Sequence, residues 1–373
     1  MKKKIGIIGS TGVLGTKLIK FLNKTDHEIT LITCYSNDAK LLKQKNITNS
    51  KSSIVLSDGL INKYKNLNYG SHHLSKFIIN NKIDIFYILD TGYKTLEYLD
   101  LITKFQKNCL IAIANKEALI AGGSLLIKNI ANSDNNFLPL DSEHFSLFDH
   151  LQLDNKCISK IFLTASGGPF YFNKNLNLKN IKLKDAIKHP VWKMGYKNSI
   201  DSSNMINKIL EIFELSSILN ISPSKIDIAI SPEAFIHSIV YFMDQRINLN
   251  CFVNDMMIPM SHPFFSDPFI KKVNTDLELI NNNNLKLFKF DNQKFQIFPH
   301  YKSILKYSHP KQIIFMMLNS EVVDRFVNNK VKYNQIIPFI MDNINKFHLP
   351  KKFDNLNSII KFMNKNTLKI RSL

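Results

Sequence analysis

The stretch Lys4-Ile5-Gly6-Ile7-Ile8-Gly9-Ser10-Thr11-Gly12-Val13-Leu14-Gly15 decides how the chain begins to fold. The part before Gly9 is mostly apolar, which predicts a buried strand. After the glycine-rich turn, apolar residues return with the spacing of one helix face, at Leu14, Leu18, Ile19 and Leu22. A strand, a glycine turn and a helix in this order predict the first unit of a parallel α/β sheet.

Three further apolar runs predict strands of the same sheet: Glu28–Thr33, Ile83–Leu89 and Leu110–Ala114. They alternate with helix-like segments, as a sheet built from βαβ units requires. Residues 1–140 are therefore predicted to form a Rossmann-like, doubly wound domain of the kind that binds dinucleotides.

The pattern changes after residue 140. Strands are predicted at Ile158–Thr164, Ile226–Ile230 and Ile236–Phe242, and an amphipathic helix between Ser203 and Leu219. Residues 141–270 are thus expected to form an α+β catalytic domain. An irregular linker at 271–300, which contains the run Asn281–Asn284, is expected to lead to a small helical domain at 301–373.

Charge and cysteine content restrict the class of protein. The formal net charge is +19, but the lysines are scattered along the chain and no zinc-finger spacing or RNA-binding signature accompanies them. A small phosphorylated substrate is therefore favoured over nucleic acid, which stays an alternative. The four cysteines form no Cys-x-x-Cys pair, and no apolar run is long enough to cross a membrane. We expect a cytoplasmic protein without a membrane partner.

The glycine turn predicts a dinucleotide site. Gly9, Gly12 and Gly15 would let backbone N–H groups approach a pyrophosphate at a helix N-terminus. No acid follows the second predicted strand, which favours NADP over NAD. Ser36 and Asn37 could instead bind a 2′-phosphate. A turn that binds nothing is the alternative.

Two groups of polar residues predict further chemistry. Asp141 and Glu143 lie two apart, so that on an extended segment both carboxylates point to one side and could hold a divalent metal. Asn207, Lys208 and Glu211 share one face of the predicted helix, beside its apolar stripe. An ordinary solvated Lys–Glu pair is the alternative for that face.

Two turns predict binding segments. The glycines of Thr164-Ala165-Ser166-Gly167-Gly168-Pro169-Phe170 would let backbone donors and the Ser166 hydroxyl close on a phosphate. His189-Pro190-Val191-Trp192-Lys193-Met194-Gly195 carries the only tryptophan and has the composition of a mobile flap. A plain turn and a core tryptophan are the respective alternatives.

These segments, in this order, resemble the 1-deoxy-D-xylulose 5-phosphate reductoisomerase family. Gly9–Gly15 is similar to its cofactor turn, Asn115-Lys116-Glu117 to its junction motif and Leu140–His144 to its metal segment. Its phosphate loop, flap and following helix motif are matched by Ser166–Phe170, His189–Gly195 and Asp201–Glu211.

The resemblance implies reduction and isomerisation of 1-deoxy-D-xylulose 5-phosphate to 2-C-methyl-D-erythritol 4-phosphate for isoprenoid synthesis, with NADPH and Mg²⁺ or Mn²⁺, or Co²⁺, in a homodimer. The implied metal ligands are Asp141, Glu143 and Glu211. The implied catalytic residues are these three with Lys116 and His189. The implied substrate contacts further include Ser142, Ser166, Ser202, Asn207, Lys208, Trp192 and Met194. The implied cofactor contacts are Ser10, Thr11, Gly12, Val13, Leu14, Ser36, Asn37, Asn115, Glu117 and Gly195.

Several positions depart from the family pattern. Leu89-Asp90-Thr91-Gly92-Tyr93-Lys94-Thr95 is poorer in small residues than the family's glycine-rich loop. Ile209 stands where glycine is usual and Asn204 where threonine is common, while Ser231–Ala234 and Phe252–Met256 differ from the family's patterns. Two alternatives to the reductoisomerase function therefore stay open. The chain could be an NADP-dependent dehydrogenase of another small phosphorylated substrate, or a homologue that has lost its catalytic activity.

Overall fold

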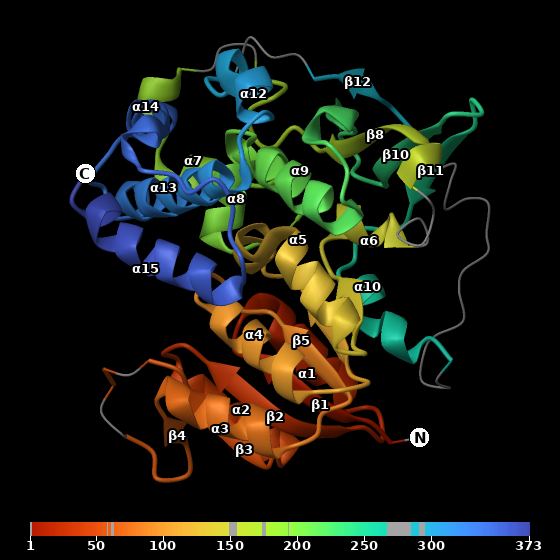
Figure 1. The fold of residues 1–373 in the computed structure, drawn as a ribbon, viewed down its shortest axis with the longest axis vertical. Coiled ribbons are helices and arrows are strands. Elements are labelled where there is room, and N and C mark those ends of the chain that lie inside the picture. Colours follow the sequence, from red (N-terminus) through yellow and green to blue (C-terminus); the bar gives the residue numbers. More distant parts are fainter. Residues whose placement is uncertain are drawn as a thin grey trace. The chain divides into compact units, whose positions relative to one another are not determined.

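The computed structural model describes residues 2–57, 59–60, 63–148, 155–173, 177–192, 194–266, 285–290 and 295–373. These residues cluster into two compact units, which Figure 1 draws as ribbons. The first unit comprises Met1–Phe145 and Asp255–Val273, and the second comprises Ser146–Asn254 and Asn274–Leu373. The segment from Asp255 thus returns to the first unit, whereas the sequence placed it in the catalytic domain. The predicted linker lies largely outside the described residues.

The first unit contains a seven-stranded sheet in the order β4-β3-β2-β1-β5-β6-β7, with every neighbouring pair parallel. Its strands are β1 Lys4–Ile8, β2 Glu28–Cys34, β3 Ser52–Val55, β4 Asn68–Tyr69, β5 Ile85–Ile88, β6 Leu110–Ile113 and β7 Asn136–Pro139. Its helices are α1 Val13–Leu22, α2 Asp38–Thr48, α3 Ser71–Asn80, α4 Thr95–Phe105, α5 Lys116–Asn132, α6 Ser142–Phe145 and α10 Met257–Ser261, which a 3-10 turn at His262–Phe264 follows.

This arrangement confirms the predicted α/β class. The central strands β1 and β5 are buried on both faces because helices cover the sheet, which is why they read as continuous apolar runs. The order reverses between β1 and β5, and such a switch leaves a crevice at the carboxyl ends of the two strands. The sequence did not predict the short strands β3, β4 and β7.

The second unit contains a five-stranded sheet in the order β11-β10-β8-β9-β12. Only β8 and β9 pair in parallel among these described strands. The strands are β8 Ile158–Ala165, β9 Ile226–Ile230, β10 Ile236–Phe242, β11 Ile247–Cys251 and β12 Phe288–Lys289. The helices are α7 Leu183–Ala186, α8 Tyr196–Ser203, α9 Ile206–Leu219, α12 Phe298–Ile304, α13 His309–Val327, α14 Ile336–Asn343 and α15 Leu356–Arg371. Short 3-10 turns lie at Asn155–Cys157, Leu178–Asn180, Pro223–Lys225, Tyr333–Gln335 and Ile344–Lys346.

The amphipathic helix predicted between Ser203 and Leu219 is confirmed as α9, which begins at Ile206 because Met205 adopts a left-handed conformation (φ 68°) that separates α8 from α9. One local prediction was wrong. The segment from Asp141 to Glu143 is not extended, because Ser142 already begins α6. A helical turn places these two acids by its own geometry and not by strand alternation.

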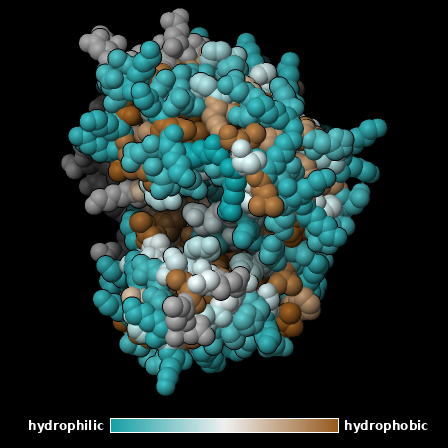
Figure 2. All heavy atoms as spheres, turned by 90° about the vertical axis from the view of Figure 1, so that its left-hand side faces the viewer, coloured by the Kyte–Doolittle hydropathy of each residue, from teal (hydrophilic) through white to brown (hydrophobic). Residues whose placement is uncertain are grey.

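No helix in the described part of the chain is long and apolar enough to cross a membrane. The face drawn in Figure 2 is mostly hydrophilic, with hydrophobic side chains in small separate groups.

Candidate active site

The glycine turn joins β1 to α1 and packs against the end of β5. A Cβ on Gly9 (φ 88°) would lie 2.4 Å from the backbone nitrogen of Asp90, and one on Gly15 would lie 2.5 Å from the Ser10 carbonyl oxygen. A Cβ on Gly12 would meet only the Gly9 carbonyl oxygen at 3.4 Å. The fold itself therefore requires Gly9 and Gly15, whereas the exposed Gly12 leaves room for a ligand.

The other residues of the turn differ in what they offer a cofactor. Thr11 and Leu14 are half-buried and Val13 is exposed at the start of α1. Ser10 is fully buried, and its hydroxyl group lies 2.7 Å from the Gln44 amide oxygen and 3.0 Å from the Thr33 carbonyl oxygen. The Ser10 side chain thus holds the turn in place within the first unit.

The loop after β2 carries the predicted 2′-phosphate residues. Ser36 and Asn37 are both exposed, and the Asn37 side chain caps α2 by accepting the backbone N–H of Lys40 at 3.1 Å. The Lys40 ammonium group donates to the Thr11 carbonyl oxygen at 2.7 Å. A lysine therefore lies against the glycine turn, where an anionic cofactor would meet it.

The junction motif lies at the start of α5. Asn115 caps this helix by accepting the Ala118 N–H at 2.9 Å, and its amide group donates to the Gly92 carbonyl oxygen at 3.0 Å. Lys116 and Glu117 follow in the first turn and are nearly buried. The Lys116 ammonium group forms an ion pair with Asp141.

Asp141 lies just before α6, and Glu143 lies within this short helix. Asp141 is held from two sides, by Lys116 and by the Nδ1 atom of His144 at 2.9 Å. Ser142 donates its hydroxyl hydrogen to the Glu143 carboxylate at 2.5 Å. His144 is fully buried, and no role was predicted for it from the sequence although it is the last residue of the metal segment. Its position beside Asp141 orients that carboxylate.

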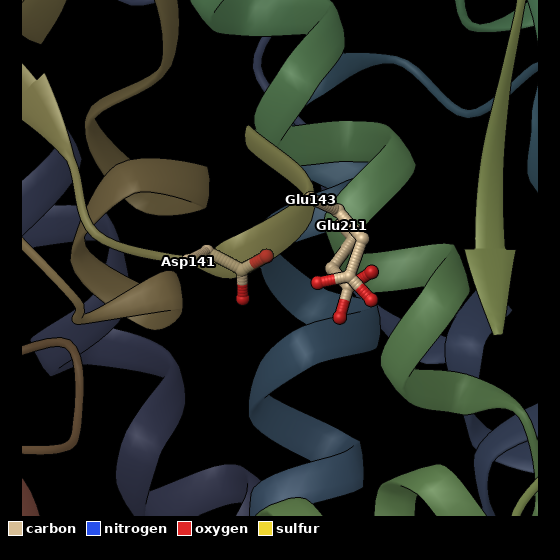
Figure 3. Close-up of side chains that lie close together, drawn as sticks. All are labelled: Asp141, Glu143 and Glu211. Carbon is tan, nitrogen blue, oxygen red and sulfur yellow. The ribbon is translucent and has the colours of Figure 1, made fainter. Parts of the chain in front are cut away.

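The second unit contains the third predicted acid. The Glu211 carboxylate on α9 accepts hydrogen bonds from the Asn207 amide and from the Lys208 ammonium group, the latter at 2.6 Å. Lys208 and Glu211 are both buried, so this is not the solvated surface pair that was the alternative. Figure 3 draws the three acids: Asp141 comes from the turn before α6, Glu143 from α6 and Glu211 from α9.

The phosphate loop and the flap segment meet within the second unit. The Ser166 hydroxyl lies 3.2 Å from Nε2 of His189, and it accepts the Gly168 N–H at 3.2 Å. The Nδ1 atom of His189 accepts the backbone N–H groups of Val191 and Trp192, at 3.2 and 2.9 Å. In the neutral ring the proton must therefore lie on Nε2, which donates to Ser166.

The remaining predicted residues lie in the flap segment or in α8, which follows it. Ser202 is half-buried near the end of α8, and Gly195 is the exposed residue that precedes that helix. Trp192 and Met194 are half-buried, and the Trp192 ring lies 6.5 Å from the ring of His237. Lys193 lies outside the described residues.

Asp90 is a residue whose chemistry the sequence did not predict. It follows β5, and its carboxylate accepts hydrogen bonds from Thr95 at 2.6 Å and from Asn115 at 3.3 Å. Burial, followed by the nearby negative charge of Glu117, raises the pKa of Asp90 to about 6 against the opposing effect of these two hydrogen bonds. The departure from the family pattern at 89–95 was the only signal of it.

The parallel sheet, its switch point and the glycine turn define the first unit as a dinucleotide-binding α/β fold. Two family models match the chain: the 1-deoxy-D-xylulose 5-phosphate reductoisomerase C-terminal domain over residues 137–219, and the DXP reductoisomerase C-terminal domain over residues 253–367. The 1-deoxy-D-xylulose 5-phosphate reductoisomerase of Pelagibacter ubique (strain HTCC1062) is 35% identical and covers 100% of this chain and 99% of the relative. That of Wolbachia pipientis wMel is 31% identical, over 96% and 94%. The chain belongs to the 1-deoxy-D-xylulose 5-phosphate reductoisomerase family.

Solved structures share this fold. The reductoisomerase from Zymomonas mobilis in complex with NADPH superposes with a TM-score of 0.83 at 21% identity, over 100% of this chain and 99% of that one. A DOX-P reductoisomerase in complex with NADPH, fosmidomycin and magnesium gives 0.89 at 24% identity, over 99% and 97%. The similarity extends over the whole chain, including the helical C-terminal part.

Proposed function

We propose that this protein converts 1-deoxy-D-xylulose 5-phosphate to 2-C-methyl-D-erythritol 4-phosphate with NADPH and a divalent metal, as a step of isoprenoid precursor synthesis. The observation that carries the proposal is the pairing of the predicted metal acids with lysines inside each unit. Lys116 pairs with Asp141 in the first unit, and Lys208 with Glu211 in the second. Each pair places a positive charge against a carboxylate that is proposed to bind the metal.

The acids fit a hard divalent cation. Asp141 and Glu143 in the first unit and Glu211 in the second are the proposed metal ligands, and carboxylate oxygens are the ligands that Mg²⁺ and Mn²⁺ prefer. We propose Mg²⁺, Mn²⁺ or Co²⁺ as the ion. A bound cation would polarise oxygens on adjacent carbons of the sugar. The residues around the acids orient them: Lys116 and His144 hold Asp141, and Ser142 holds Glu143.

The first unit fits NADPH. The exposed Gly12 and the N-terminus of α1 would receive the pyrophosphate. Ser36 and Asn37 lie on the loop expected to bind the 2′-phosphate, and Lys40 follows in the first turn of α2. Asn115 caps α5 shortly after β6, and Glu117 lies in the first turn of that helix, where the nicotinamide side is expected. The cofactor would supply the hydride that reduces the rearranged aldehyde.

The second unit carries the residues proposed for the phosphate group of the substrate. Ser166 accepts the Nε2–H of His189, so this hydrogen bond orients the Ser166 hydroxyl group, which can donate its own hydrogen to a phosphate. Ser202, Asn207 and Lys208 are proposed to complete this site. Trp192 and Met194 are proposed to close over the ligand and exclude water, and Gly195 to contact the cofactor.

A dehydrogenase that reduces another small phosphorylated substrate without rearrangement is the second candidate. It is favoured only by the departures at Ile209 and at Ser231–Ala234. We further propose a cytoplasmic homodimer, the state that the resemblance implies.

The test is NADPH oxidation with 1-deoxy-D-xylulose 5-phosphate, with and without Mg²⁺, for the wild type and for Glu211→Gln. We expect metal-dependent turnover in the wild type and a loss of roughly 100-fold in the variant, the scale seen when a group that supports a metal is removed. Glu321→Gln is the matched control, because Glu321 lies on α13, pairs with Arg325 and is not one of the predicted site residues. Wild-type protein that binds NADPH but turns over no substrate with any divalent metal would overturn the proposal.

A further inference from the structure

The loop that departs from the family pattern, residues 89–95, forms a hydrogen-bonded cluster in the first unit. The Asp90 carboxylate accepts the Thr95 hydroxyl hydrogen at 2.6 Å through one oxygen and the Asn115 amide at 3.3 Å through the other. Asn115 donates in addition to the Gly92 carbonyl oxygen and lies 3.1 Å from the Thr95 hydroxyl. The carboxylate of Asp90 thus fastens the loop to the start of α5.

The cluster touches the glycine turn on one side. A Cβ on Gly9 would lie 2.4 Å from the Asp90 nitrogen and 2.7 Å from its Cα, so the two backbones are in direct contact. Leu89 extends the parallel ladder by donating its N–H to the Ile8 carbonyl oxygen at 2.8 Å. A shift of the Asp90 backbone would therefore displace Gly9 and with it the glycine turn.

On its other side the cluster reaches the substrate-side acid. Asn115 caps α5, and the next residue along the helix is Lys116, which forms an ion pair with Asp141. His144 holds the second oxygen of Asp141 at 2.9 Å. An unbroken series of packed backbone and polar contacts thus runs from Gly9 through Asp90, Asn115 and Lys116 to Asp141.

We propose that Asp90 is a positioning residue that couples the glycine turn to Lys116. Through its contacts, the position of Lys116 stays fixed relative to the turn that is proposed to bind the cofactor. The inference rests on the proposed function for the roles of these two ends. A carboxylate suits this position because it accepts from Thr95 and Asn115 at once, whereas an asparagine has only one accepting oxygen and would turn its NH2 group toward one of the two. Glu117 on α5 is the charged group that acts on Asp90.

The test compares Asp90→Asn with the wild type by three measurements. Fluorescence titration gives the dissociation constant for NADPH, and steady-state kinetics give kcat at saturating NADPH and substrate. Acetylation of Lys116, followed by mass spectrometry on the cofactor-free protein, reports the Lys116–Asp141 pairing without any turnover. We expect the dissociation constant to rise, kcat to fall and Lys116 acetylation to quicken, each by about fivefold, the effect of one hydrogen bond.

Two further variants keep the result interpretable. Asp134→Asn removes a carboxylate from an exposed left-handed position of the same unit, which asparagine tolerates, and should change none of the three values. If Asp90→Asn does not fold, Thr95→Val replaces it with the same expectations, because it removes the hydroxyl group that donates to Asp90 and accepts from Asn115.

The outcomes separate the two proposals. If Asp90→Asn changes the dissociation constant for NADPH but neither kcat nor the rate of Lys116 acetylation, Asp90 acts only on the glycine turn. The proposed coupling to Lys116 is then wrong. The coupling is equally wrong if a folded variant matches the wild type in all three measurements. A wild type without turnover contradicts the proposed function instead, and Lys116 acetylation still decides the coupling.

Discussion

At the scale of single residues, Asp90 illustrates how surroundings set protonation. A free aspartate has a pKa near 4, and burial raises the pKa of Asp90 to about 6. Between these two values the folded protein holds a proton that the unfolded chain has released. The free energy of unfolding must therefore fall as the pH rises from about 4 to about 6 through this group.

This sign gives a prediction for stability. The difference in unfolding free energy between the wild type and Asp90→Asn should change by on the order of 2 kcal/mol from pH 4 to pH 7, to the disadvantage of the wild type at the higher pH. Urea unfolding at a series of pH values measures it. Asp134→Asn should run parallel to the wild type, and parallel curves for Asp90→Asn would contradict the raised pKa.

At the scale of elements, the glycines of the turn between β1 and α1 serve two purposes. Some are required by the packing of the fold, and one leaves space for a ligand. Gly15 lies on α1 with the Ser10 carbonyl oxygen 2.5 Å from where a Cβ would be placed. Gly12 precedes α1 in an ordinary extended conformation (φ −66°), so alanine can adopt its backbone angles. The two positions form a matched pair for mutation.

We expect Gly15→Ala to lower the unfolding free energy by roughly 1–3 kcal/mol, because backbone atoms must shift to admit the methyl group. Gly12→Ala should fold with nearly wild-type stability but bind NADPH about tenfold or more weakly, since its methyl group would occupy the space of the pyrophosphate. Thermal unfolding and fluorescence titration of both variants check this. Equal NADPH affinity in Gly12→Ala and the wild type would place the pyrophosphate elsewhere.

The break between α8 and α9 fixes where the second helix starts. The positions three and four residues after Ile200 are the polar Ser203 and Asn204, and the apolar spacing of α9 begins only at Ile206. The left-handed Met205 turns the chain, and the Asn204 side chain accepts the Ile206 N–H at 3.0 Å to begin the next helix. Ser202 and Asn207 therefore lie on different helices, which one continuous helix could not achieve.

At the scale of the whole molecule, the chain leaves the first unit at Phe145 and returns to it at Asp255. The returning segment is anchored by the buried Tyr87 of β5, whose hydroxyl group donates to the Met260 carbonyl oxygen at 2.6 Å. Phe264 adds a contact with the ring of Phe21 at 5.9 Å. The first unit is thus completed by residues that follow most of the second unit's sheet.

Tyr87→Phe tests this anchor. Loss of the hydroxyl leaves a buried carbonyl oxygen without its partner, so the α10 segment should open more readily by about 1 kcal/mol, or roughly fivefold in hydrogen exchange. Exchange of the amides of α10, followed by mass spectrometry, measures the change. Tyr35→Phe is the control because Tyr35 is 71% exposed; an equal change in both variants would exclude a specific anchor.

The sequence by itself determined the elements whose signal is local. The strand, glycine turn and helix at Lys4–Leu22, the buried strands β2, β5 and β6, and the helical C-terminal part all follow from apolar spacing and turn residues, because burial imposes a period on the chain. The motifs at Asn115–Glu117 and Leu140–His144 identified the family by residue type and order.

Only the tertiary structure decided which groups meet. It paired Lys116 with Asp141 and Ser166 with His189, placed Asp90 against Gly9, and returned Met260 to Tyr87. Each pair joins positions that are far apart in the sequence, so no local pattern records the contact. The pKa of Asp90 depends on this enclosure, because desolvation arises only when distant segments have closed around the carboxylate.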